Sequence, residues 1–136
     1  MNSMQILLLG HEGSGRRGLE RTLTRLGYVV MSADTQAMAA PPSSGDMIMV
    51  DLRDDSTPHE HLADALRGDG RPLVAVSDTP TDAVRRLIGR PAGTMVLTGA
   101  ESDAGYKVAL SVCQALLRGA SAREAQMAQE TGVVVA

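Results

Sequence analysis

Short apolar runs alternate with helical patterns along most of this chain. Five runs of five to seven residues, rich in Leu, Val, Ile and Met, have the length and composition of buried strands. Between them, apolar residues recur at spacings of three and four, which predicts helices. The strands are expected at 4–10, 28–32, 46–51, 72–77 and 94–98, and the helices after Gly15 and at 59–66, 81–89 and 102–118.

This alternation predicts a single α/β domain built on a doubly wound, five-stranded parallel sheet. The expected strand order is 2-1-3-4-5, the flavodoxin-like arrangement. Helices should cover both faces, because continuous apolar strands are typical of sheets that are buried on both sides. The first helix should end at Leu26, since Gly27 stands where a helix C′ glycine belongs.

The helical pattern is weakest between the second and third strands. A helix over 35–40 would be stopped by Pro41-Pro42, so it should be short or irregular, and about five helices are expected in all. In the helix at 81–89, three apolar residues are expected to face inward: Val84, Leu87 and Ile88.

Polar side chains follow four of the predicted strands at the point where each strand ends. Glu12, Asp51, Ser77 and Thr98 occupy these positions. The carboxyl ends of parallel strands meet at one edge of the sheet, and open α/β sheets bind their ligands there. A functional site is therefore expected at this edge.

Composition indicates a globular domain with an aliphatic core. Hydrophobic residues make up 43% and charged residues 21% of the 136 residues, and only Tyr28 and Tyr106 are aromatic. A net charge of −3 argues against a nucleic-acid surface in this segment. No signal peptide and no apolar run of about 18 residues is present, which predicts a cytoplasmic protein that does not enter a membrane. The single cysteine, Cys113, is expected to pack in the core.

The strand ends carry motifs that resemble the CheY-like receiver domains of two-component response regulators. In that family the first strand ends in adjacent acids, as in ILIVDDE, and the matching segment here is Ile6-Leu7-Leu8-Leu9-Gly10-His11-Glu12. The third strand of a receiver ends in the phosphoacceptor aspartate followed by leucine, and Asp51-Leu52 falls there. The resemblance covers residues 4–118 and implies the receiver fold.

The resemblance implies a role for each polar strand end. Asp51 would be the phosphoacceptor, and Ser77 and Thr98 would be switch residues. Glu12, Asp51 and the backbone carbonyl of Arg53 would form a thin Mg²⁺ site, and no other cofactor is expected. Each side chain also has a structural alternative, because strand-end acids and hydroxyls commonly cap turns or the first turn of a helix.

Four positions depart from the receiver pattern. Gly10 and His11 stand where receivers carry two acids, Gly99 stands where they carry a lysine, and Val96 replaces an aromatic switch residue. Phosphoryl transfer to a carboxylate needs a divalent metal and a cation to neutralise the phosphoryl oxygens. These losses predict a regulatory pseudoreceiver, not an enzyme, with weak or absent phosphorylation. Such degenerate receivers stand in front of ANTAR antiterminators and sigma-54-dependent activators.

A second motif points to another class of protein. The segment Gly10-His11-Glu12-Gly13-Ser14-Gly15-Arg16-Arg17 follows a strand and begins a helix, as a P-loop does. Its glycine spacing fits, but Arg16 replaces the phosphate-binding lysine and Arg17 replaces the Mg²⁺-binding hydroxyl. The alternative prediction is a degenerate P-loop protein that binds nucleotide through backbone amides.

The C-terminal segment predicts an extension of the domain. Residues 1–118 form the receiver-like domain, while 119–136 continue as an exposed helix over 121–130 and end in a tail at 131–136. Receivers joined to an output domain often use this helix as a dimerising linker. The expected partners are therefore a second copy of the chain, or a sensor or output protein, and not nucleic acid or a membrane. The predicted dimer interface is the final strand and helix over 96–118, extended by the helix over 121–130. Its apolar residues are Tyr106, Val108, Val112 and Leu116.

Overall fold

The structure is a computed structural model of the chain. It describes residues 4–11, 13–35, 38–53, 60–78, 82–98 and 102–135, and from 120 to 135 it describes the backbone only. Among the described helices, none combines the length and the apolar character that crossing a membrane requires.

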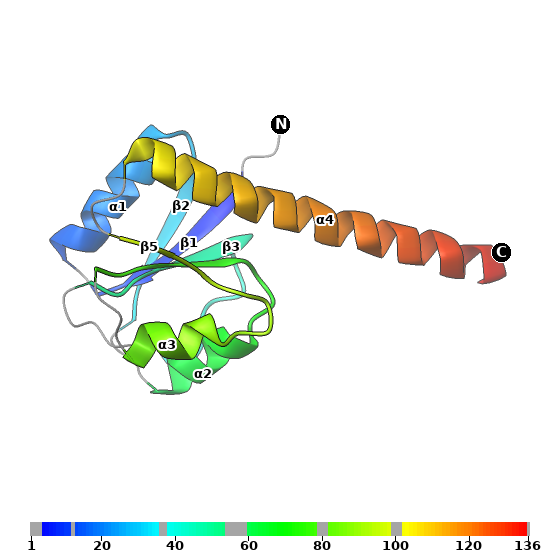
Figure 1. Cartoon of the computed structure of the whole chain (residues 1–136), viewed down its shortest axis with the longest axis horizontal. Helices are drawn as coiled ribbons and strands as arrows, with labels where there is room; N and C mark the ends of the chain where they lie inside the picture. The colour runs from blue at the N-terminus through cyan, green and yellow to red at the C-terminus, as the bar shows by residue number, and fades with distance from the viewer. Residues whose placement is uncertain are drawn as a thin grey trace.

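A parallel sheet of five strands forms the centre of the molecule (Figure 1). The strands follow the order β2-β1-β3-β4-β5, and every neighbouring pair is parallel. This confirms the predicted doubly wound fold and its strand order. The strands are β1 (Gln5–Gly10), β2 (Val29–Asp34), β3 (Met47–Asp51), β4 (Leu73–Val76) and β5 (Met95–Leu97).

Four helices cover the sheet within the described residues, two on each face (Figure 1). The helices α1 and α4 pack on one face, and α2 and α3 pack on the other. Gly27 follows the first helix with a φ of +95°, which confirms it as a C′ glycine in the left-handed region. The helices are α1 (Ser14–Arg25), α2 (Glu60–Gly68), α3 (Asp82–Ile88) and α4 (Asp103–Val135).

Each strand contributes alternate residues to two separate core layers, as the period of two in a strand requires. On β1, Ile6 and Leu8 face α1 and α4, whereas Leu7 and Leu9 face α2 and α3. The strands β1, β3 and β4 are therefore buried on both sides, which explains why their sequences are continuous apolar runs.

Cys113 on α4 lies in the first core layer and has no exposed surface. Burial raises the pKa of its thiol to about 11, so the reactive thiolate is scarce at neutral pH. We expect Ellman's reagent to label the folded protein only as fast as the fold opens, and to label the protein at once in concentrated guanidinium chloride. Rapid stoichiometric labelling of the native protein would contradict this expectation.

The connection from β2 to β3 differs from the sequence prediction. The helix expected over 35–40 is absent from the described residues of this connection, which run as an irregular segment instead. Its residue Gly45 has a φ of +93°, and a Cβ added there would lie 3.0 Å from the Cβ of Leu7. Only glycine permits this approach, so the loop that follows Pro41-Pro42 packs closely on β1.

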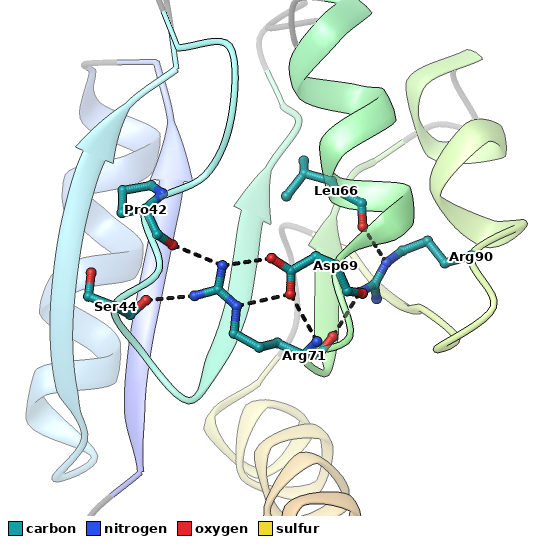
Figure 2. Close-up of polar contacts among 6 residues, drawn as sticks. All are labelled: Pro42, Ser44, Leu66, Asp69, Arg71 and Arg90. Atoms are coloured by element: carbon teal, nitrogen blue, oxygen red, sulfur yellow. Dashed lines mark hydrogen bonds and ion pairs between the residues drawn. The ribbon is translucent and has the colours of Figure 1, made fainter.

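A polar cluster at the amino ends of the strands holds this connection in place (Figure 2). The guanidinium of Arg71 donates to the carbonyl of Ser44 at 2.7 Å and to that of Pro42 at 2.9 Å. It also forms an ion pair of 2.7 Å with Asp69, which lowers the pKa of that carboxyl. The loop before β3 is thereby tied to the turn before β4.

Arg90 follows α3 by two residues, completes the cluster and is only 4% exposed. Its guanidinium donates to four backbone carbonyls, one in the last turn of α2, two in the connection from α2 to β4 and one in the connection from α3 to β5. Figure 2 shows the first three of these residues around Arg90. Burial lowers the pKa of Arg90. The four carbonyl acceptors replace the water that the buried guanidinium has lost. The four carbonyls belong to Leu66, Asp69, Arg71 and Gly93.

Two further details correct the sequence prediction. Ile88 is 56% exposed, because Val84 and Leu87 define the buried side of α3 and Ile88 lies on its flank at the last turn. The final helix runs without a break through Gly119 to Val135, so most of the segment expected as a tail is helical. A glycine costs a helix only about 1 kcal/mol, and no proline interrupts this stretch.

Candidate functional site

The carboxyl ends of β3, β4 and β5 meet at one edge of the sheet, as the sequence predicted. Backbone hydrogen bonds extend the ladder past the strand ends, from Leu52 N to the carbonyl of Val76 and from Ser77 N to that of Leu97, both at 2.8 Å. Asp51 is buried at the end of β3, and Ser77 is buried just after β4. Thr98 follows β5 and is exposed, whereas Glu12 lies outside the described residues.

Asp51 is bound by the residue two positions later. The guanidinium of Arg53 donates from Nε to Oδ1 at 2.9 Å and from Nη2 to Oδ2 at 3.0 Å. The Arg53 backbone N–H adds a third bond to Oδ1 at 3.1 Å. Both carboxylate oxygens are thus engaged by one side chain, and this hydrogen bonding raises the pKa of Arg53.

The same guanidinium connects the strand end to the first helix. Arg53 Nη2 also donates to the carbonyl of Gly15 in the first turn of α1, at 2.9 Å. The side chain of Arg53 is 19% exposed and that of Asp51 only 7%, so the pair is largely removed from water. Sequence reasoning assigned Arg53 only a backbone carbonyl. The signal that it missed is an arginine two residues after a strand-end acid, close enough to fold back on it.

Gly10 packs tightly against Asp51 at this edge, and a second arginine lies beside it. A Cβ added at Gly10 would lie 3.1 Å from the Cβ of Asp51, which is a tight contact, and 3.7 Å from the Cδ of Arg16, which is an ordinary one. Arg16 donates from Nη1 to the Gly10 carbonyl at 3.2 Å. Arg16 therefore lies next to the position where receivers carry one of their acidic side chains.

The described residues at this edge do not fit Mg²⁺. Magnesium prefers an octahedral shell of oxygen ligands, including one or two carboxylates that are free to bind it. Of the implied ligands, Glu12 is not described, and both Asp51 oxygens already accept hydrogen bonds from Arg53. No group of three His, Cys, Asp or Glu side chains suited to a metal occurs in the part of the chain that the structure describes.

The P-loop alternative is not favoured by this arrangement. In a P-loop, a lysine at the position of Arg16 extends to the phosphates. Here the Arg16 guanidinium turns back to the Gly10 carbonyl, and the Gly15 carbonyl is occupied by Arg53. In the glycine-rich segment, Arg16 and Arg53 thus bind backbone carbonyls of the protein itself, and the Arg16 guanidinium is not extended toward a phosphate site.

The structure separates the four predicted interface residues into two groups. Tyr106 is buried in the core against the sheet and is only 4% exposed, so it does not belong to a surface, and this part of the prediction is wrong. It is the first of the buried residues along α4. The other three residues are exposed, at 65% for Val108, 43% for Val112 and 48% for Leu116. Val96 on β5, the first residue of the predicted surface, is also exposed, at 43%.

No protein-family model matches the sequence, and no curated protein matches it either. Several solved structures share its fold. A CheY-like response regulator from Mesorhizobium loti is 21% identical with a TM-score of 0.64, and the match covers 82% of this chain and 98% of that one. A receiver protein from Sinorhizobium medicae WSM419 is also 21% identical, with a TM-score of 0.62 and coverage of 86% and 96%.

A third match extends along the whole chain. It is a fusion that contains a yeast Spc42 trimeric coiled-coil segment, 13% identical, with a TM-score of 0.67 and coverage of 99% of this chain and 96% of that one. The strand order, the helical layers and these similarities agree, and this chain has the CheY-like fold of response-regulator receiver domains.

Proposed function

We propose that this chain is a cytoplasmic pseudoreceiver of a two-component system, which regulates an output such as transcription through protein contacts. It is not an enzyme in this proposal, and phosphorylation of Asp51 is weak or absent. The single observation that carries the proposal is the Asp51–Arg53 ion pair inside a receiver fold. The similarity to receiver domains supports the regulatory class, and the ion pair supports the atypical mechanism.

The chemistry of the pair explains why the phosphoacceptor would be inactive. A carboxylate attacks phosphorus through an oxygen lone pair, and the phosphoryl oxygens need positive charge placed around them. Here the available cation is bound to the nucleophile itself, and it engages both Asp51 oxygens. The attack would require breaking a buried, charge-assisted contact before any new one forms.

We expect transfer from acetyl phosphate to Asp51 to be slow or undetectable, with intact-protein mass spectrometry as the measurement. Beryllofluoride should bind weakly for the same reason, since it needs the same carboxylate. Removing the guanidinium in Arg53→Ala does not supply the missing acids and lysine, so this variant should remain a poor phosphoacceptor.

The control for this experiment is Asp51→Asn, which keeps the size of the side chain but removes the nucleophile. Any slow labelling of the wild type should disappear in this variant if it occurs at Asp51. Rapid, stoichiometric and Mg²⁺-dependent labelling that Asp51→Asn abolishes would contradict the proposal, because it would require an intact phosphorylation pocket.

A further inference from the structure

A row of arginines lies along the exposed side of α1. Arg17, Arg21 and Arg25 follow one another at intervals of four residues, so they share one face of the helix, and we call them the arginine row. All three are exposed, whereas Leu19 and Leu23 of the same helix are buried in the core. Figure 1 shows α1 at the end of the molecule that lies away from the C-terminus.

The arginine row concentrates positive charge in an otherwise acidic protein. The helix α1 contains four arginines and one glutamate, a net charge of +3, whereas the whole chain carries −3, so the remaining residues carry −6. A local excess of this kind attracts anionic groups over roughly 10 Å at 0.1 M salt. The exposed side of α1 is therefore a surface that favours a negatively charged partner.

A hollow of about 520 Å³ lies over the row. The described residues that line it all belong to α1, and they are Arg17, Glu20, Arg21, Thr24 and Arg25. Within the described residues, the side chains of Arg17, Glu20 and Arg21 make no hydrogen bond or ion pair. Each guanidinium has five N–H donors, so the donors of Arg17 and Arg21 are available to a ligand in the hollow.

The third arginine of the row shows which chemical group suits it. Arg25 donates from Nη1 to Oδ2 of Asp103 at 2.8 Å and from Nη2 to Oδ1 at 3.0 Å. Asp103 lies in the first turn of α4, so the row already binds a carboxylate of another helix. The hydrogen bonds from Arg25 lower the pKa of Asp103. This two-point contact is the geometry in which guanidinium groups bind carboxylates best.

We propose that Arg17 and Arg21 bind an acidic helical segment of a partner protein. Acids placed four residues apart on the partner helix are separated by about 6 Å along its axis, the same interval that separates Arg17 from Arg21. Each carboxylate would accept two hydrogen bonds, as Asp103 does from Arg25. This inference rests on the proposed function, because it names the chemistry of one protein contact through which the module acts.

A short acidic segment suits the row better than a nucleic acid does. From Arg17 to Arg25 the row spans only about 12 Å of helix. A nucleic acid would extend its closely spaced phosphates beyond this length, over a protein whose other residues carry a net negative charge. Glu20 inside the hollow would repel such a continuous polyanion, whereas a helix can place an uncharged residue opposite it.

The test uses the full chain and an alanine-rich helical peptide that carries glutamate at every fourth position and a fluorescent label. Fluorescence anisotropy at low ionic strength should show saturable binding of one peptide per chain, and added salt should weaken it. Arg17→Gln combined with Arg21→Gln should raise the dissociation constant about tenfold, because two charge-assisted contacts are lost. Glutamine is a good helix former, so α1 should keep its structure.

Arg67→Gln combined with Arg86→Gln is the matched control, since it removes the same two charges from exposed positions on α2 and α3, on the other face of the sheet. It should leave the dissociation constant nearly unchanged. Absence of binding at low salt, an equal loss in the control variant, or equal binding of a peptide with glutamine in place of each glutamate would overturn the inference.

A single-stranded oligonucleotide is the competing ligand in the same assay. If it bound more tightly than the peptide and needed Arg17 and Arg21, the row would be assigned to nucleic acid and the inference would be wrong. Acetyl phosphate labelling depends on Asp51 and is read separately. Failure of the peptide contact and failure of the proposed function are therefore distinguishable.

Discussion

Arg90→Met is expected to lower the free energy of unfolding by about 4 kcal/mol, because it removes four hydrogen bonds to buried or partly buried carbonyl groups at roughly 1 kcal/mol each. The methionine fills much of the same space but donates no hydrogen bond. Urea denaturation should show a lower midpoint with an unchanged slope, which is the signature of lost stability without a change in the exposed surface.

Arg90→Lys tests whether the stability comes from the positive charge or from the four hydrogen bonds of the guanidinium. Lysine keeps the charge but has one ammonium, which cannot reach four carbonyls spread over the turns before β4 and β5. We therefore expect Arg90→Lys to lose about half as much stability as the methionine variant.

Arg86→Ala provides the control, on the helix that precedes Arg90. Arg86 is exposed on α3, so its loss should change the free energy of unfolding by less than about 0.5 kcal/mol. If Arg90→Met were as stable as Arg86→Ala, the carbonyls would be satisfied by water, and the described role of Arg90 in joining α2 to the connections before β4 and β5 would be wrong.

Arg53→Ala is expected to produce the second large loss, about 3 kcal/mol, because it leaves the Asp51 carboxylate buried without its partner. The variant also breaks the contact to the Gly15 carbonyl, so the start of α1 loses its connection to β3. Urea denaturation of the variant and of the wild type measures this loss.

A double-mutant cycle isolates the ion pair from the other contacts of Arg53. Asp51→Asn removes the charge of the partly buried partner, and adding it to Arg53→Ala should restore about 2 kcal/mol relative to Arg53→Ala alone. Strictly additive losses would show that the two side chains do not interact in solution, and this would remove the observation that carries the proposed function.

The pattern of apolar residues was sufficient to predict the sheet. Runs such as Leu73–Val76 are buried on both faces, and this state requires a continuous apolar sequence that can be recognised without coordinates. The positions of Asp51 and Ser77 at one edge followed directly, because parallel strands bring their carboxyl ends together. Gly27 could be predicted as the residue that ends the first helix, because the end of a helix depends on a few neighbouring residues.

Contacts between distant segments were not predictable in this way. Periodicity placed Tyr106 and Val108 on the same helix, but which of them faces the sheet depends on how α4 is rotated against the core. In the connection from β2 to β3, Pro41-Pro42 indicated where helical structure would stop. The packing of the following loop on Leu7 depends on Gly45 and on Arg71, which is 27 residues from the Ser44 carbonyl that it binds.

The sequence by itself determined the fold and the edge at which a site would lie, because both follow from the alternation of apolar runs and helical patterns along the chain. Only the tertiary structure decided which side chains bind one another at that site. Arg53 folds back on Asp51 while it also binds the carbonyl of Gly15, 38 residues away, and Arg16 folds back to the carbonyl of Gly10. The orientation of a long side chain depends on every acceptor within its reach, and only the folded chain brings those acceptors together.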